Sequence, residues 1–312
     1  MGTKRHRHIA SLEVLVGGMC YGANATMYKL ALAAGFSWPQ MVAGQMFFAV
    51  LCFMALLLVS RFNGKDWVSI PLPMLAKLIG LGMLTCGTSV FYCFSMTMLP
   101  VSVSLTLLFQ FTWIGLVIQT AFSKRLPRLF ELVAVAIILL GTVFASGVYK
   151  TGIAGYDPVA LLCALGASVS CSLFVSLSGK VEAPCSSEQR GVIVCAGSVV
   201  MSLTVCPDYV VSGVLAQGIL LFAVIAGFFG LLCPVLLFGM GSPHLPAGLS
   251  TVMAAAELPA GLLVAMIVLG EPLGVVEWLG VAIILAGVCL AQVPSLLEDR
   301  EARRAAAGQA VS

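Results

Sequence analysis

The chain alternates between long apolar runs and short segments that carry its charges. A helix needs about 20 residues to cross about 30 Å of hydrocarbon. The runs are unbroken for longer than the ~10 residues of a membrane barrel strand and lack period-2 alternation. They lie near residues 9–34, 40–60, 73–97, 100–122, 129–148, 157–178, 190–206, 215–240, 246–269 and 275–293. The pattern predicts an all-α polytopic membrane protein with ten transmembrane helices.

Composition excludes the soluble classes. Residues of the hydrophobic set make up 60% of the 312 positions and charged residues only 9%, whereas soluble domains carry about 25% charge. The eleven cysteines are odd in number and contain no CxxC pair, which disfavours a disulfide scaffold or a zinc site. We therefore expect no metal or other cofactor. The net charge of +3 does not indicate nucleic-acid binding here, because what matters is where the charged residues lie along the chain.

The basic residues predict how the chain is oriented. If ten helices alternate in direction, 14 of the 16 Lys and Arg residues fall on the side of the N-terminus, and only Lys29 and Lys150 fall opposite. Loops rich in Lys and Arg stay in the cytoplasm. The sequence thus predicts a multi-pass protein of the cytoplasmic (inner) membrane with both termini in the cytoplasm.

The two halves of the chain repeat each other at one fixed offset. ELVAVAIILLGTVFA at 131–145 matches EWLGVAIILAGVCLA at 277–291, 146 residues later, with eight identities in fifteen positions. The same offset pairs Pro100 with Pro246 and Ser104 with Ser250. We predict a first repeat at 1–150 (helices 1–5), a second at 151–297 (helices 6–10), and a charged cytoplasmic tail at 298–312.

Five helices in each repeat make the second repeat enter the membrane from the opposite side. Charge agrees with this inversion, because Lys124, Arg125 and Arg128 in the first repeat correspond to Gly270, Glu271 and Gly274 in the second. Inverted repeats of this kind occur in many secondary transporters, where the binding site lies at the bilayer midplane. The expected architecture is two inverted five-helix repeats around a central cavity.

The second half also resembles a known family. AAELPAGLLVAMIVLGEPLG at 255–274, followed by WLGVAIILAGVCLA at 278–291, is similar to the second repeat of the drug/metabolite transporter superfamily, of the EamA type. The first half departs from the pattern, since FSKRLPRLF at 122–130 has no Gly-Glu pair, and Leu258 separates Glu257 from Pro259. The resemblance implies a ten-helix, alternating-access carrier whose cavity is lined by helices 1, 3, 4, 6, 8 and 9, with helices 5 and 10 as peripheral supports.

Glu257 is the main candidate for a functional residue. It lies about eleven residues into the ninth run, which at 1.5 Å per residue is near the middle of the bilayer. A carboxyl group at that depth costs at least ~2.5 kcal/mol and marks a transport pathway by default. It could bind a substrate ammonium or exchange a proton; a purely structural role is the alternative. Pro259 removes a backbone donor and disturbs the helix one turn back, near the Ala255 carbonyl, which predicts a helix break beside Glu257.

Other polar and aromatic residues fall at a similar depth and are candidates for the same cavity. They could hydrogen-bond a carboxylate or amide and stack on an apolar group, although such residues also bond neighbouring helices for packing. These residues are Tyr21 and Asn24 in the first run, Tyr92 in the third, Gln110 and Trp113 in the fourth, and Ser170 in the sixth.

These features favour a carrier over an enzyme. The chain has no HExxH motif, no Ser-His-Asp spacing and no GxxxxGKS phosphate loop, so transport energy would come from a gradient. We expect a secondary-active carrier of small metabolites, such as amino acids, that works as an exporter with proton coupling as an option. A carrier of cationic drugs or quaternary amines is the alternative, and a polytopic membrane enzyme a more distant one. The expected partners are a small-molecule substrate and the lipid bilayer, without nucleic acid; a homodimer is left open.

Overall fold

The structure is a computed structural model, and it describes residues 2–290 except 63, 65–66, 100, 125, 146, 152–154, 182 and 271–273. The predicted tail at 298–312 lies outside these residues. The described part is helical and contains no strand. Its α-helices are α1 (Gly2–Ala33), α2 (Trp38–Phe62), α3 (Leu72–Met98), α4 (Val101–Leu108), α5 (Phe111–Ser123), α6 (Leu129–Ala145), α7 (Val148–Thr151), α8 (Pro158–Ser178), α9 (Ser187–Val205), α10 (Leu220–Gly227), α11 (Cys233–Gly241), α12 (Ala247–Ala254) and α13 (Glu257–Leu269), followed by a last helix at Val275–Leu290.

The eighth apolar run is helical but irregular. Two π-helical segments, Leu215–Ile219 and Phe228–Leu232, precede α10 and α11, and a short 3₁₀ turn, Ser242–His244, follows α11. Every apolar run predicted from the sequence therefore contains helix. Single-turn π segments are frequent at functional sites, and the second of them lies beside α1 and α2.

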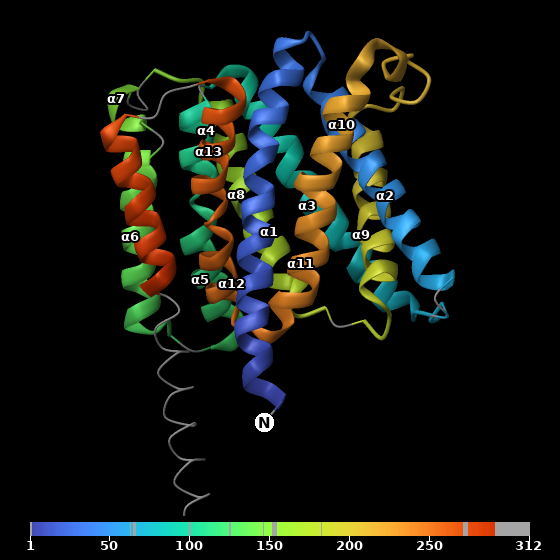
Figure 1. The fold of residues 1–312 in the computed structure, drawn as a ribbon, viewed down its shortest axis with the longest axis horizontal. Coiled ribbons are helices and arrows are strands. Elements are labelled where there is room, and N and C mark those ends of the chain that lie inside the picture. The colour runs from blue at the N-terminus through green and yellow to red at the C-terminus, as the bar shows by residue number, and fades with distance from the viewer. Residues whose placement is uncertain are drawn as a thin grey trace, which may run out of the picture.

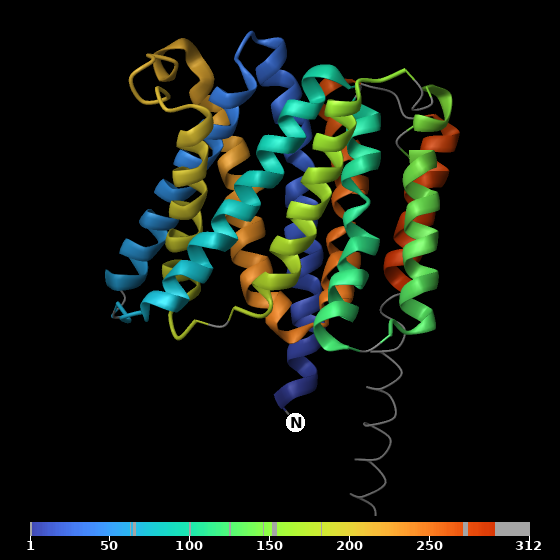
Figure 2. The ribbon, with the colours of Figure 1, turned by 180° about the vertical axis from the view of Figure 1, so that it is seen from behind.

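The helices stand side by side as one bundle (Figure 1). α6 and the last helix form one edge of the bundle, and α2 and α9 lie at the other edge in both views (Figures 1 and 2). α1 runs through the centre and contacts α11, α12 and α13, while α3 contacts α8 and α9. This arrangement brings α1, α3 and α13 together in the middle of the molecule.

Six helices of the described residues are long and apolar enough to cross a membrane. They span Trp38–Phe62, Leu72–Met98, Val103–Phe122, Pro158–Ser178, Leu215–His244 and Leu249–Leu269. The apolar helices Leu129–Ala145 and Val275–Leu290 are shorter. α1 and α9 contain charged and hydroxyl residues that lower their hydropathy. The chain thus has the make-up of a polytopic membrane protein.

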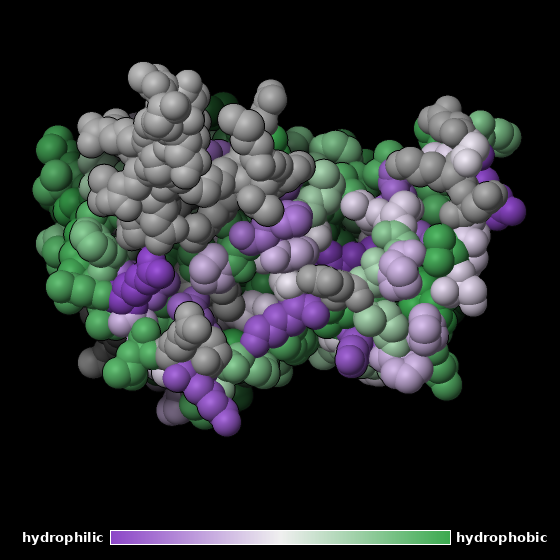
Figure 3. Space-filling model, turned by 90° about the horizontal axis from the view of Figure 1, so that it is seen from below, coloured by the Kyte–Doolittle hydropathy of each residue, from purple (hydrophilic) through white to green (hydrophobic). Residues whose placement is uncertain are grey.

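Polar residues gather at the end of the bundle on which the N-terminus lies. Seen from that end, hydrophilic side chains lie across the face and hydrophobic ones dominate the flanks (Figure 3). On the flanks the large apolar side chains are exposed, as in Leu58 of α2 and Ile267 of α13, at 52% and 75%. Such exposure would be costly in water and is expected against lipid.

Two helices are interrupted at equivalent places in the two halves. α4 gives way to α5 at Phe109 and Gln110, and α12 gives way to α13 at Ala255 and Ala256. The bounds of α4 and α5 recur in α12 and α13 at the offset of 146 residues. So does the left-handed residue that ends each second segment, Lys124 with φ 51° and Gly270 with φ 67°. The internal repeat is therefore a repeat of local structure as well as of sequence.

Candidate functional site

Glu257 is the first residue of α13, directly after the interruption that separates α12 from α13. Its residue exposure is 7%, so the carboxyl group is buried in the middle of the bundle. The positive end of a helix dipole lies at its N-terminus and favours a nearby carboxylate. The interruption therefore places a helix N-terminus at Glu257, which partly stabilises the buried carboxylate, whereas the surrounding apolar residues do not.

Glu257 lines a pocket with residues from α1 and α3. Tyr21, Asn24, Ala25 and Tyr28 come from α1, Thr88, Ser89 and Tyr92 come from α3, and Leu108 ends α4. The cavity volume is about 10 Å³, which is close to the least space that holds one water molecule. The pocket is thus contracted, and a larger ligand requires the helices around it to move apart.

A close helix crossing holds α1 against α13 at this level. A Cβ added to Gly22 would lie closer than 3.0 Å to the Glu257 carbonyl oxygen and to the Gly261 backbone nitrogen. Gly18, one turn earlier, meets the backbone of Ala254 in the same way. Small residues at four-residue spacing allow such approach between membrane helices. Gly22 therefore allows α1 to approach the backbone of α13 closely beside Glu257.

Hydrogen bonds connect the pocket to α2. The Asn24 Nδ2 donates to Tyr28 Oη at 3.2 Å, and Tyr28 Oη donates to Gln45 Oε1. Gln45 lies in α2 and is fully buried. Tyr21 Oη and Thr85 Oγ1 share a hydrogen bond of 3.1 Å between α1 and α3. The polar side chains of the pocket are thus held in place by helices on two sides.

Several polar atoms of this region have no hydrogen-bond partner among the described residues. Asn24 Oδ1, Ser89 Oγ and Tyr92 Oη line the pocket, and Gln45 Nε2 lies beside it on α2. Buried polar groups without partners cost about 1–3 kcal/mol each. A cluster of them around a carboxyl group is what a binding site for a polar ligand requires.

The structure brings four of the sequence-predicted residues together, since Glu257, Asn24, Tyr21 and Tyr92 all line this pocket. Pro259 lies in the first turn of α13, where it is buried. Three remaining candidates lie elsewhere. Ser170 Oγ donates to the Leu84 carbonyl oxygen at 2.7 Å, and Trp113 Nε1 donates to Gln110 Oε1 at 2.8 Å, with Trp113 43% exposed.

Sequence reasoning missed Gln45 and Thr88 as functional candidates. A signal for Gln45 was available, because it is an amide in the middle of an apolar run of about twenty residues. Polar groups at that depth are costly unless they face a partner or a cavity. The facing of Thr88 and Ser89 depends on how α3 is rotated, which only the packing decides.

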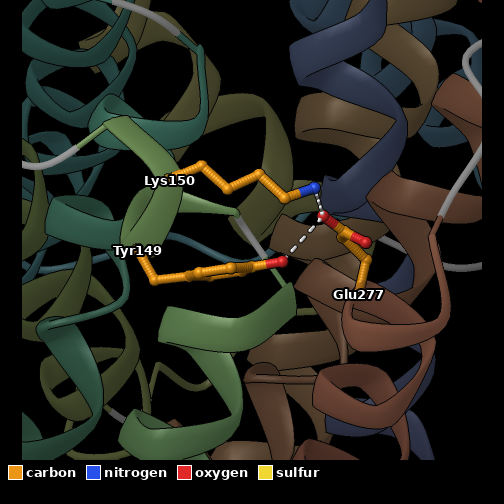
Figure 4. A network of polar contacts seen from close by, with 3 residues as sticks. All are labelled: Tyr149, Lys150 and Glu277. Carbon is orange, nitrogen blue, oxygen red and sulfur yellow. Dashed lines mark hydrogen bonds and ion pairs between the residues drawn. The ribbon is translucent and has the colours of Figure 1, made fainter.

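A second polar cluster lies at the other end of the bundle and joins the two halves of the chain (Figure 4). Lys150 Nζ of α7 lies 2.5 Å from Glu277 Oε1 in the last helix, and the Tyr149 hydroxyl donates to the same oxygen at 3.5 Å. The Lys150 side chain is 59% exposed and that of Glu277 11%. The adjacent Glu277 carboxylate raises the pKa of the Lys150 ammonium above its ordinary range.

Comparison with known proteins gives a fold but no family. No protein-family model matches the chain, and no curated protein matches it. Twenty-nine chains of solved structures do. One of them, "Crystal structure of protein", has a TM-score of 0.71 and 16% sequence identity, and the match covers 93% of this chain and 98% of the other. At this identity the match establishes a shared fold over nearly the whole chain and carries nothing about activity.

Proposed function

We propose that this protein is a secondary-active carrier in which two inverted five-helix repeats, ten membrane helices in all, alternate access to the pocket around Glu257. Its substrates are small metabolites such as amino acids, and it works as an exporter in the cytoplasmic membrane with both termini inside. The observation that carries the proposal is a buried carboxyl group facing unpaired polar atoms at the centre of an apolar bundle.

The repeat geometry supports inversion. α6 and the last helix run antiparallel at one edge (Figures 1 and 2). They are the two segments that match at the offset of 146 residues. Antiparallel equivalents are expected from a two-fold axis in the membrane plane and not from one along its normal. The sequence resemblance to the EamA type of drug/metabolite transporters points the same way.

The contracted pocket supports a cycle with a closed state. A volume near that of one water molecule excludes an open channel through this level. A carrier passes through such a state between its two open forms, because access from both sides at once would dissipate the gradient. Rocking of one repeat against the other would widen the space between α1, α3 and α13.

We assign to Glu257 the coupling between proton movement and substrate transport. A carboxyl group in a closed pocket away from bulk water favours its neutral form, and an opening toward water favours the charged form. Proton loss on one side and proton uptake on the other would then accompany substrate exchange. Such a cycle distinguishes a carrier from an enzyme, because the substrate leaves the pocket chemically unchanged.

A carrier of cationic drugs or quaternary amines is the second candidate. Glu257 is the only charged residue among the pocket residues, and three tyrosines, Tyr21, Tyr28 and Tyr92, stand around it. Aromatic faces and one carboxylate attract a cation. The two candidates differ in whether the substrate must donate hydrogen bonds, which a quaternary amine does not.

The decisive experiment is a flux assay in proteoliposomes with an imposed pH gradient. Labelled amino acids and a quaternary amine are offered to the wild type, to Glu257→Gln and to the control Glu13→Gln, which changes an acid of α1 outside the pocket. We expect Glu257→Gln to reduce flux at least about tenfold, equivalent to ~1.4 kcal/mol, with substrate recovered chemically intact. Unaltered flux and pH profile in Glu257→Gln, at equal protein level, would reject the role of this residue.

A further inference from the structure

A second cavity opens at the end of the bundle on which the N-terminus lies. It is bounded by the last turns of α2, the first turn of α9 and the end of α11. Its volume is about 610 Å³, within the range of about 300–1,000 Å³ for pockets that hold small organic ligands. It shares no lining residue with the pocket around Glu257, so it is a separate site. We call it the α2–α9–α11 crevice.

One wall of the crevice is apolar. Leu56 and Val59 of α2 face Leu236 and Met240 of α11. Val59 is 58% exposed and Met240 39%, so the wall is open toward the flank of the bundle. Leu56 lies one helical turn, about 6 Å, deeper than Ser60. An elongated apolar group running from the end of the bundle along its flank fits this wall.

The outer part of the crevice contains groups that can donate hydrogen bonds to a phosphate. Ser60 is 6% exposed, lines the crevice, and its Oγ has no partner among the described residues. Ser186 caps α9 by accepting from the Gln189 backbone nitrogen at 3.2 Å. The next residue, Ser187, lies in the first turn of α9, where backbone N–H groups have no intrahelical acceptor and the helix dipole favours an anion.

The rim also carries an acidic side chain. Glu188 lines the crevice in the same first turn of α9. A carboxylate at this place opposes a ligand that carries only negative charge, and it attracts an ammonium group that donates hydrogen bonds. Donors for a phosphate, an acceptor for an ammonium and an apolar wall below them together describe one molecule.

We propose that the α2–α9–α11 crevice binds a single aminophospholipid of the phosphatidylethanolamine type. Its phosphate lies at Ser60 and the N-terminus of α9, its ammonium at Glu188, and one acyl chain along Leu56 and Met240. The proposal needs only that this end of the bundle meets a membrane surface, and it stands apart from the transport activity. A lipid held here ties α2 to α9 and α11 at the bundle edge.

The test is native mass spectrometry of the full-length detergent-solubilised protein with defined lipids. Phosphatidylethanolamine, phosphatidylglycerol and phosphatidylcholine of identical chains are titrated separately. We expect one phosphatidylethanolamine per chain with at least about fivefold higher affinity than the other two. Glu188→Gln should remove the preference over phosphatidylcholine, whose quaternary ammonium does not donate hydrogen bonds, and Ser60→Ala should weaken all three lipids. Glycerophosphoethanolamine, the head group without chains, should not compete at equal concentration.

Two bulky substitutions on the same helix separate a site from general lipid adhesion. Leu56→Trp fills the crevice and should reduce phosphatidylethanolamine affinity at least about tenfold, or ~1.4 kcal/mol. Leu58→Trp, at an exposed position outside the crevice, should leave affinity within about twofold. Equal binding of the three lipids, tighter binding of phosphatidylglycerol, or equal losses in both Trp variants would overturn the proposal. Thermal unfolding without added lipid reports whether each variant is folded.

Discussion

Gly141 of α6 and Gly287 of the last helix, 146 residues apart, occupy reciprocal places in one helix–helix contact. A Cβ on Gly141 would lie 2.8 Å from Ile284 Cγ1, and a Cβ on Gly287 would lie 2.7 Å from Ile138 Cγ1. Ile138 and Ile284 are themselves separated by 146 residues. Each contact is therefore the image of the other, as a local two-fold axis between the two helices requires.

This reciprocity predicts equal penalties for equivalent substitutions. Gly141→Ala and Gly287→Ala should each be destabilising, because overpacking of about 1–3 kcal/mol outweighs the gain in helix propensity of about 1 kcal/mol. Unfolding midpoints in mild detergent measure the effect. Gly80→Ala is the matched control, since a Cβ at this helical glycine meets nothing within 4 Å and should be neutral or stabilising. A large penalty at only one of the two glycines would argue against the two-fold relation.

The hydrogen bond from Tyr28 to Gln45 leads to a second testable prediction. Gln45→Leu removes the acceptor of the Tyr28 hydroxyl and leaves that buried group unpaired. We expect a loss of stability of about 1 kcal/mol, the usual scale for hydrogen bonds between membrane helices, and a loss of transport because Asn24 is held through Tyr28. Gln217→Leu, at an exposed position, is the control. Full flux in Gln45→Leu would show that the pocket is positioned without this bond.

Depth along each helix was predictable from the sequence, whereas the direction in which a side chain faces was not. A constant rise per residue places Asn24 and Glu257 at one level once the runs are known, and both line one pocket. Gln110 and Trp113 share that level but point toward each other on α5's outer side, where Trp113 is exposed. Rotation about a helix axis depends on packing against neighbours, as at Gly22, and a single apolar run contains little of that information.

The Lys150–Glu277 ion pair predicts a pH dependence of stability. The pKa of Lys150 is raised from its ordinary 10.5 by the adjacent carboxylate, so the folded state binds this proton more tightly than the unfolded state. The contribution is fully present below pH 10.5 and is lost as pH rises through the higher pKa of the folded state. Unfolding midpoints between pH 8 and about pH 12 should fall more steeply for the wild type than for Lys150→Met. Because the ammonium is exposed, the difference should shrink in high salt. Parallel curves for the two proteins would contradict the assignment.

Pro259 allows a prediction that separates local sequence from repeat architecture. The interruption before α13, at Ala255 and Ala256, lies three to four residues ahead of Pro259, which suggests a proline kink. The first repeat, however, is interrupted at the equivalent place with Trp113 where the second has Pro259. There, Thr112 Oγ1 donates to the Phe109 carbonyl oxygen at 3.0 Å, and Gln110 Nε2 donates to the Thr106 carbonyl oxygen at 3.1 Å. The two helices therefore share a break that does not depend on a missing backbone donor. Pro259→Ala should keep the interruption, retain flux within about twofold, and gain stability from the better helix former. Hydrogen exchange of the Ala255–Leu258 amides reports the break directly, and strong new protection there together with lost transport would assign the break to the proline.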